Sequence, residues 1–190
     1  MITESRVRLC PKRLSDAADD YAWQTDPELT RLDASSPLTM EFTQYLLRYA
    51  DKLYCARQVK HQFAIETPDG EHIGNCAYYG VNNQKGEAEI GIMIGNRNYW
   101  EKGYGADAIA ALVDHIFLKT NLKRIYLKTL DTNERAQRCF SQCGFTECGR
   151  LVDNGHSFVL MELYRHQWQQ GRDKTGRKIG LYKRVGCRPG

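Results

Sequence analysis

The spacing of apolar side chains differs along the chain. Spacing of three to four residues predicts a helix, and strict alternation with polar residues predicts a strand. A short apolar stretch at Arg6–Cys10 predicts an edge strand, which Pro11 ends. Ser15–Trp23 and Thr39–Gln58 carry apolar side chains at helical spacing and are predicted helices. Asp26–Pro37 lies between them, and its two prolines favour a loop.

The period then changes from helical to alternating. His61–Thr67, Glu71–Val81 and Glu87–Ile94 are three predicted strands. Turn residues separate them at Pro68–Gly70 and Asn82–Gly86. Because the turns are short, the strands are expected to pair as an antiparallel meander.

The pattern after the meander combines helices and strands. It predicts a helix at Gly103–Thr120, a strand at Arg124–Leu130, a helix at Asn133–Cys143 and strands at Phe145–Val152 and Ser157–Tyr164. Asn133 and Gly144 have the residue types that begin and end a helix. This order predicts an α/β (α+β) fold: one domain with a mixed, mostly antiparallel sheet and helices on both faces.

The 190 residues suit one domain, predicted at 1–165, followed by a basic C-terminal tail at 166–190. The tail carries seven Lys or Arg and one acid, Asp173, whereas the body carries 20 basic and 22 acidic side chains. The body is therefore not expected to bind nucleic acid, and only the tail is suited to contact RNA. Alternatively, the tail is a solvated, poorly ordered terminus. No membrane-length apolar run or signal peptide is visible, so a cytoplasmic protein is expected.

The cysteines do not predict a metal site. The chain has seven cysteines and no CxxC pair. Cys139 and Cys143 have the spacing of a helical pair, but a structural zinc site needs a second pair of ligands. No metal is therefore predicted.

The stretch NRNYWEKGYGADAI, Asn96–Ile109, contains two glycines before a predicted helix. No P-loop pattern is present. Residues 103–108 fit the GxGxxA form of a dinucleotide fingerprint, and Asp131 ends the next strand. That fingerprint normally follows the first strand of a βαβ unit, whereas three strands and two helices precede it here. A dinucleotide site is therefore only a third alternative.

A pyrophosphate loop is the better interpretation of this stretch. Gly103 and Gly105 let the backbone approach a diphosphate without a Cβ, and the helix N-terminus adds a positive field. Lys102 and Arg97 can add charge. The simpler alternative is that both glycines only form a tight turn.

Two segments resemble the GCN5-related N-acetyltransferase (GNAT) superfamily over residues 6–164. AEIGIMIGNRNYWEKGYGADAIAALVDHIF is similar to the central strand, acetyl-CoA loop and helix of the branch that contains the ribosomal-protein N-terminal acetyltransferases. NERAQRCFSQCGF resembles the next helix. The family loop is commonly [QR]xxGx[GA], and Trp100 replaces its first residue here.

The resemblance implies that acetyl-CoA lies between two central strands that separate, Glu87–Ile94 and Arg124–Leu130. The backbone of one strand would pair with the pantetheine arm, and a backbone N–H near Ile92 or Met93 would stabilise the oxyanion. The loop would bind the diphosphate. The implied cofactor-binding residues are Ile92, Met93, Ile94, Arg97, Lys102, Gly103, Tyr104, Gly105, Ala106, Asn133 and Phe140.

The implied reaction is direct attack of an amine on the thioester, which requires a base. Glu89, just before the strands separate, is the candidate, and Glu87 is its nearest rival. Alternatively, Glu89 pairs with a neighbouring Lys or Arg. Many family members carry a tyrosine acid where this chain has Phe140. The thiolate would leave without it, because a thiol pKa of about 8.5 makes a tolerable leaving group.

Several questions about the acceptor stay open. Asp33, Ser35, Ser36 and Asp153 could hold a cationic amine, although Asp and Ser are also ordinary loop residues. His156 could be a base, but a histidine of the turn is the simpler interpretation. A peptide N-terminus, a polyamine and an aminoglycoside-like amine are not separated, and the branch resemblance favours a protein α-amine. A homodimer is left open. The alternative function is a non-catalytic GNAT-fold binding module that contacts RNA or a protein partner through the tail.

Overall fold

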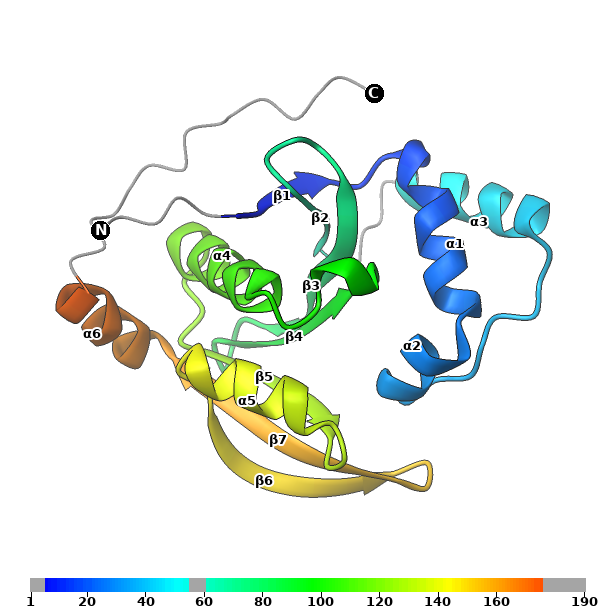
Figure 1. Ribbon diagram of the computed structural model, residues 1–190. Helices are drawn as coiled ribbons and strands as arrows, with labels where there is room; N and C mark the ends of the chain where they lie inside the picture. The colour runs from blue at the N-terminus through cyan, green and yellow to red at the C-terminus, as the bar shows by residue number, and fades with distance from the viewer. Residues whose placement is uncertain (1–5, 55–60, 176–190) are drawn as a thin grey trace.

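One seven-stranded sheet organises the molecule (Figure 1). The computed structural model describes residues 6–54 and 61–175, with side chains described up to Gly171. The strand order across the sheet is β1-β2-β3-β4-β5-β7-β6. The strands are β1 (Arg8–Pro11), β2 (His61–Glu66), β3 (His72–Asn82), β4 (Glu87–Ile94), β5 (Arg124–Leu130), β6 (Thr146–Asp153) and β7 (His156–Tyr164).

Strands β1 to β4 pair antiparallel, as the predicted meander requires. Strand β5 joins β4 in parallel and pairs antiparallel with β7, which in turn pairs with β6. The β6–β7 turn places Asn154 and Gly155 at φ 48° and 77°, the left-handed pair of a tight hairpin. The predicted mixed, mostly antiparallel sheet is therefore confirmed.

Helices lie on both faces of the sheet (Figure 1). They are α1 (Ala17–Thr25), α2 (Pro27–Leu32), α3 (Phe42–Tyr54), α4 (Tyr104–Lys119), α5 (Glu134–Gln142) and α6 (Arg165–Thr175), with 3₁₀ turns η1 (Leu14–Asp16) and η2 (Arg97–Tyr99). Helix α4 contacts β1, β3 and β4. Helix α1 meets the other face of β3, where Asn75 donates to Asp20 at 2.6 Å.

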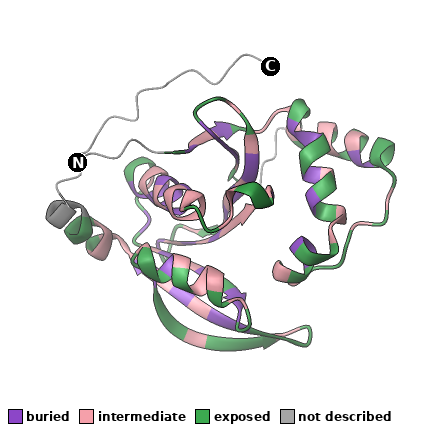
Figure 2. Ribbon diagram, viewed as in Figure 1, coloured by how far each residue is buried: buried purple, intermediate pink, exposed green. Residues whose placement is uncertain are grey.

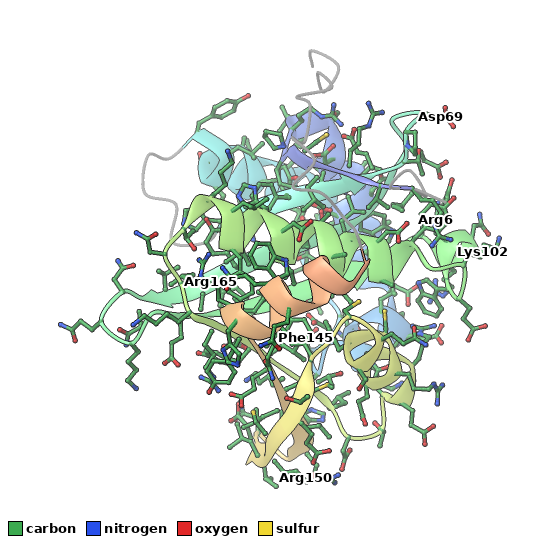
Figure 3. All side chains as sticks on the ribbon, turned by 90° about the vertical axis from the view of Figure 1, so that its left-hand side faces the viewer. Arg6, Asp69, Lys102, Phe145, Arg150 and Arg165 are labelled. Atoms are coloured by element: carbon green, nitrogen blue, oxygen red, sulfur yellow. The ribbon has the colours of Figure 1, made fainter. Side chains whose placement is uncertain are left out.

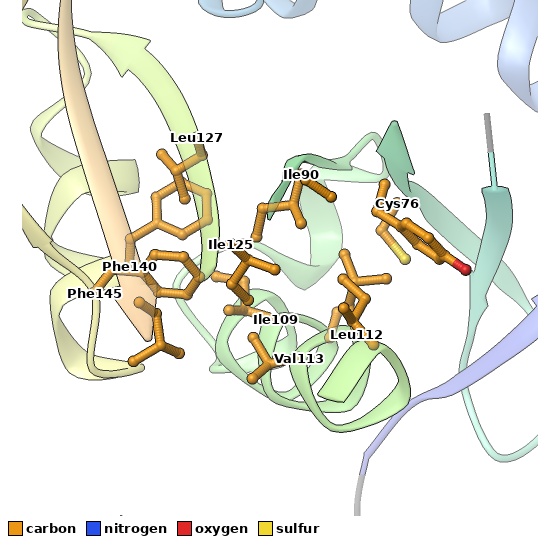
Figure 4. Packing of buried hydrophobic residues seen from close by; sticks show 14 of the residues in the cluster. Cys76, Ile90, Ile109, Leu112, Val113, Ile125, Leu127, Phe140 and Phe145 are labelled. Atoms are coloured by element: carbon orange, nitrogen blue, oxygen red, sulfur yellow. The ribbon is translucent and has the colours of Figure 1, made fainter. Parts of the chain in front are cut away.

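The hydrophobic core lies between α4 and the sheet (Figure 4). The α4 side chains Ile109, Leu112 and Ile116 are at most 2% exposed, and they pack with Ile125 of β5. Burial of each such side chain contributes about 1.5–3 kcal/mol. The purple residues in Figure 2 follow this layer, whereas β6 at the sheet edge is mostly green. The core therefore holds β4 and β5 firmly at the positions where they begin to separate.

Helix α2 replaces the predicted loop at Asp26–Pro37, and that prediction is wrong for Pro27–Leu32. The Asp26 carboxylate accepts from the backbone N–H groups of Glu28 and Leu29 at 2.9 and 3.0 Å. Pro27 occupies the first helical turn, where its missing N–H costs nothing. The proline that suggested a loop is thus part of a helix start.

Helix α6 continues the fold beyond residue 165, where the sequence pattern predicted only a tail. Arg165 donates to the carbonyl oxygens of Phe117, Thr120 and Leu122 at 2.6–2.7 Å and so caps the end of α4 (Figure 3). Trp168 Nε1 donates to Asp114 of α4 at 2.7 Å. Residues 176–190 lie outside the described residues, so a tail contact with RNA stays a prediction.

Within the described part of the chain, no helix is both long and apolar enough to cross a membrane.

Candidate active site

The site begins where the two parallel central strands stop pairing. β4 and β5 share only three paired positions, Glu87↔Arg124, Ala88↔Ile125 and Glu89↔Tyr126. Both strands continue past this point, β4 to Ile94 and β5 to Leu130. The separation opens a cavity of about 800 Å³ between them. Its walls therefore include strand backbone that makes no β4–β5 ladder.

Nine of the twelve residues predicted for the site line this cavity. They are Glu89, Ile92, Met93, Ile94, Gly103, Gly105, Ala106, Asn133 and Phe140. They come from β4, the loop before α4, α4 itself and α5. Elements far apart in the sequence thus meet at one place. Arg97, Lys102 and Tyr104 are not among the lining residues.

The loop end of the cavity is the N-terminus of α4. Gly103 precedes the helix at φ 83°, a left-handed conformation that favours glycine, and no side chain caps the helix. The first-turn N–H groups therefore have no intrahelical acceptor. A Cβ at Gly105 would lie 3.6 Å from Cys139 Sγ, an ordinary van der Waals distance, so α5 packs close to the first turn of α4. Uncapped N–H groups beside glycine fit the diphosphate of CoA.

The three residues that do not line the cavity have other contacts. Arg97 donates to Asp26 at 2.8 Å and to Glu28 at 2.9 Å, and these hydrogen bonds raise its pKa. The Lys102 carbonyl oxygen accepts from Arg6, which lies beside it in Figure 3. The Tyr104 ring packs edge-on against Tyr99, with centroids 4.8 Å apart. Arg97 thus tethers α2, while the Lys102 carbonyl and the Tyr104 ring are held by these side-chain contacts.

Helix α5 forms the wall opposite β4. The Asn133 side-chain oxygen accepts from Ala136 N at 3.2 Å, so the predicted cap is confirmed, and the amide nitrogen keeps two further donors. Phe140 is 6% exposed and its ring lies 5.7 Å from that of Phe145. A hydrogen bond with Cys143 lowers the pKa of Cys139, and the Arg135 charge adds to this effect. Position 140 thus offers the cavity a hydrocarbon ring without a hydroxyl.

Glu89 lies at the point where the strands separate, next to a tyrosine. Tyr79 of β3 is directly opposite Glu89 in the antiparallel register, and its hydroxyl donates to Glu89 Oε1 at 3.2 Å. A Cβ at Gly91 would lie 3.6 Å from Tyr79, an ordinary van der Waals distance, so Tyr79 packs over this glycine. Burial foremost, and then the Glu89 charge, raises the Tyr79 pKa. Tyr79 therefore stays protonated and orients the carboxylate.

Glu87, the rival of Glu89, is engaged elsewhere. Arg124 donates to Glu87 at 2.7 Å and to Glu162 at 2.6 Å. Glu87 does not line the cavity. Among the described residues it is Glu87, and not Glu89, that forms the ion pair with a neighbouring strand. Glu89 is thus the β4 carboxylate that faces the cavity.

The end of the cavity beyond Glu89 is formed by two distant segments. Leu29, Leu32 and Asp33 come from α2 and the residue after it, and Asp153 and His156 come from the β6–β7 hairpin. Lys128 pairs with Asp153 at 3.4 Å. The Asp33 charge contributes to raising the Tyr79 pKa, which puts it near the Glu89 pair. Ser35 and Ser36, the other acceptor candidates, are not lining residues.

Among the cavity residues that were not expected from the sequence, three bear on the chemistry: Tyr79, Trp100 as a side chain, and Arg135. The bulge between Tyr79 and Asn82 hides the Tyr79–Glu89 pairing, because counting back from the turn gives another partner. Arg135 could have been found from its position two residues after the helix cap. For Trp100, the sequence showed only that it replaces the first residue of the family loop pattern and gave no indication of its side-chain contacts.

Comparison with known proteins agrees with this geometry. The family model described as "Acetyltransferase (GNAT) domain" matches residues 6–146, well over half of the chain. An uncharacterized N-acetyltransferase, p20, of Bacillus licheniformis is 29% identical over 149 residues, which cover 78% of this chain and 83% of that protein. Spermidine N(1)-acetyltransferase of Escherichia coli is 30% identical over 109 residues, covering 57% of this chain and 56% of that protein.

Solved structures share the fold at low sequence identity. Spermidine N-acetyltransferase from Vibrio cholerae, solved with CoA and spermine, has a TM-score of 0.77 at 20% identity and covers 87% of this chain and 99% of that one. An aminoglycoside acetyltransferase solved with coenzyme A has a TM-score of 0.73 at 22% identity, with coverage of 87% and 99%. These matches do not single out the ribosomal-protein branch.

Proposed function

The chain belongs to the GNAT acetyltransferases and uses acetyl-CoA as its acetyl donor, and from this premise we propose that its acceptor is a primary amine of a small polycation. Polyamines and aminoglycosides are the molecules of this kind. The protein α-amine suggested by the sequence resemblance is the competing acceptor. We favour the polycation over the protein α-amine because the two ends of the cavity carry opposite charges.

The loop end of the cavity favours an anion through the uncapped N-terminus of α4 and the Arg135 guanidinium, against one lining carboxylate, Glu101. The other end holds three carboxylates, Glu89, Asp33 and Asp153, against one cation, Lys128. An anionic donor and a polycationic acceptor would enter such a cavity from opposite ends. A peptide N-terminus brings a single charge and leaves two carboxylates without use.

The chemistry follows from the position of Glu89. The acceptor amine arrives protonated, and Glu89 removes the proton so that the nitrogen lone pair can attack. Tyr79 holds the carboxylate by its hydrogen bond at 3.2 Å. Bound acetyl-CoA supplies the thioester carbonyl. Backbone N–H groups of β4 beyond Glu89 lie on the cavity wall, where a developing oxyanion needs donors.

Phe140 affects the last step of the reaction. The residue offers no proton to the leaving thiolate, so the thiolate takes its proton from the acceptor nitrogen or from water. We propose Glu89 as the general base of the transfer, with Tyr79 as its positioning residue. Two relatives support the acceptor class, since one is a spermidine N(1)-acetyltransferase and one structure is an aminoglycoside acetyltransferase.

The test is an acceptor screen at fixed acetyl-CoA, with release of the free thiol as the readout. Spermidine, an aminoglycoside, butylamine and a short peptide with a free N-terminus are compared by kcat/KM. We expect spermidine or the aminoglycoside to exceed butylamine by at least 10-fold, because two extra ammonium groups meet carboxylates. A peptide that outperforms both polycations would overturn the proposal.

Two further expectations stay predictions. A homodimer would need an interface, and exposed apolar side chains at the β6 edge, Leu151 at 42% and Val152 at 72%, mark one place to look for it. Use of the chain as a non-catalytic binding module would require the polycation screen to fail while the tail retains RNA in a salt-dependent manner.

A further inference from the structure

Trp100 stands at the first position of the glycine loop and has a defined place in the structure. Its indole Nε1 donates to the carbonyl oxygen of Ile94, the last residue of β4, at 2.7 Å. Both Trp100 and Ile94 line the cavity. The hydrogen bond therefore fixes the indole plane at the open end of β4.

Arg135, in the first turn of α5, lies on the Trp100 ring. The centre of its guanidinium is 3.7 Å from the ring centroid. Stacking of this kind holds a guanidinium in place while leaving its N–H groups free to bind. Because Trp100 is bonded to β4 and Arg135 belongs to α5, the pair joins the two walls of the cavity. Arg135 is half-buried and lines the cavity as well.

The charge of Arg135 is not balanced by a neighbouring carboxylate. Arg97, whose guanidinium lies 5.5 Å from the same ring, is paired with Asp26 and Glu28. Arg138, on the same helix, pairs with Glu134 at 3.0 Å. Arg135 has no such ion pair with any residue that the structure describes. A half-buried guanidinium without a counter-ion favours binding of an anion.

The position of Arg135 relative to α4 indicates which anion it meets. Cys139 lies one helical turn after Arg135, and its Sγ is 3.6 Å from the place of a Cβ on Gly105. The Cys143 thiol, one turn further, donates to the Ala106 carbonyl oxygen at 3.6 Å. Helix α5 thus runs against the first turn of α4. The guanidinium and the uncapped N–H groups of α4 face the same part of the cavity.

We propose that Arg135, held flat against Trp100, binds the diphosphate of acetyl-CoA from the side opposite the α4 N-terminus. The planar guanidinium can donate two parallel hydrogen bonds to phosphate oxygens. Trp100 is the positioning residue for this contact. The loop has a tryptophan at a position where the family commonly has Gln or Arg. In this protein Arg135 of α5 places a guanidinium against that tryptophan.

The experiment measures binding by isothermal titration calorimetry and so does not depend on the acceptor. Three ligands are titrated: CoA, dephospho-CoA, which lacks the 3′-phosphate, and pantetheine, which lacks all phosphates. The variants are Arg135→Gln and Arg135→Lys. Arg150→Gln is the control, because it removes the same charge from an exposed residue that pairs with Glu147 on the distant strand β6. Unchanged far-UV circular dichroism and Tm show that each variant folds.

We expect Arg135→Gln to weaken CoA and dephospho-CoA binding alike, by roughly 10- to 100-fold. Pantetheine binding should not change, and Arg135→Lys should recover part of the loss, because it restores charge without the planar fork. Wild-type CoA affinity in Arg135→Gln would overturn the proposal. A loss confined to CoA would assign the contact to the 3′-phosphate, and an equal loss for pantetheine would show a structural role. Either result would overturn the diphosphate assignment.

A double-mutant cycle tests the role of Trp100. Trp100→Leu removes the surface on which the guanidinium is held, so we expect it to weaken CoA binding less than Arg135→Gln does. In the double variant the two losses should be clearly less than additive, because the indole acts through Arg135. Full additivity, with the fold intact, would contradict a positioning role of Trp100.

Discussion

The two ends of the cavity between β4 and β5 are built from different parts of the protein. At the loop end, the groups offered to a ligand are the backbone N–H groups of one segment, 103–106, whose geometry glycine sets, and the Arg135 guanidinium on Trp100. At the Glu89 end, side chains come from β3, β4, the segment after α2 and the β6–β7 hairpin. A site built from backbone N–H groups alters its ligand contacts only when the path of the chain changes. A site built from side chains alters its ligand contacts with a single substitution. We therefore expect the donor end, apart from Arg135 and Trp100, to be the conservative half and the acceptor end to be the adaptable half.

The strongest way to separate the two ends is to remove the charge of Glu89. Glu89→Gln keeps the shape of the side chain and the hydrogen bond from Tyr79, but it cannot accept the amine proton. We expect kcat to fall by about 100- to 10,000-fold. Calorimetry should find the affinity for acetyl-CoA unchanged within about twofold, because the donor end is intact. A parallel loss of affinity would mean that the two ends are not independent.

The loop end is challenged next by Gly103→Ala. The new side chain meets a φ of 83° and its Cβ would clash with the Arg6 guanidinium, so the loop that would bind the diphosphate must change its path. We expect acetyl-CoA affinity to fall by roughly 10-fold or more, with kcat at saturating donor nearly unchanged. Gly80→Ala is the matched control, since Gly80 also has a positive φ, of 60°, and no atom lies within 4 Å of its Cβ position. An equal loss of acetyl-CoA affinity in both variants would mean that Gly103→Ala acts by destabilising the fold in general.

The adaptable half is tested by Asp33→Asn and Asp153→Asn. Each substitution removes one carboxylate near the acceptor while preserving shape. We expect KM for spermidine to rise by about 3- to 10-fold per substitution, and KM for butylamine to change little, because a monoamine has no second charge to place. Steady-state kinetics at saturating acetyl-CoA distinguish the two. The same rise with butylamine would argue for a change of cavity shape.

The smallest effect concerns the tether between the two ends. Arg97, foremost by its hydrogen bond, lowers the pKa of Asp26 from 3.8 to about 2, so this carboxylate stabilises the fold above pH 4 and loses its contribution as the pH falls towards 2. Asp26→Asn keeps a capping side chain without the charge. We expect its Tm to lie at most about 3 °C below wild type at pH 7. The gap should narrow between pH 4 and pH 3; a gap that persists would place the effect elsewhere.

The sequence predicted most of the sheet and the donor end because both depend on local patterns. Alternation identified the strands, and Gly103 and Asn133 mark helix starts by residue type. The two missed helices have a different origin. Pro27 was interpreted as a loop residue although Asp26 caps the helix that it begins, and α6 has few apolar side chains because Trp168 and Arg165 make its contacts with α4.

The acceptor end was only partly predictable, because it depends on register and on distant contacts. Asp33 and Asp153 were found as candidates from loop positions. The pairing of Tyr79 with Glu89 depends on a bulge that no local pattern reveals. Similarly, Arg97 satisfied the charge requirement of a phosphate loop, but a salt bridge to Asp26 and Glu28 engages it. Charge near a motif in sequence does not ensure charge near the ligand.

The early end of the β4–β5 ladder has a thermodynamic consequence. Beyond Glu89, β4 lines the cavity without pairing with β5, so bound acetyl-CoA would supply hydrogen-bond partners that β5 does not. Binding to the folded state alone adds RT ln(1 + [L]/Kd), about 2.7 kcal/mol at a hundredfold excess over Kd. The resistance of this protein to unfolding and proteolysis would therefore rise and fall with the supply of acetyl donor around it.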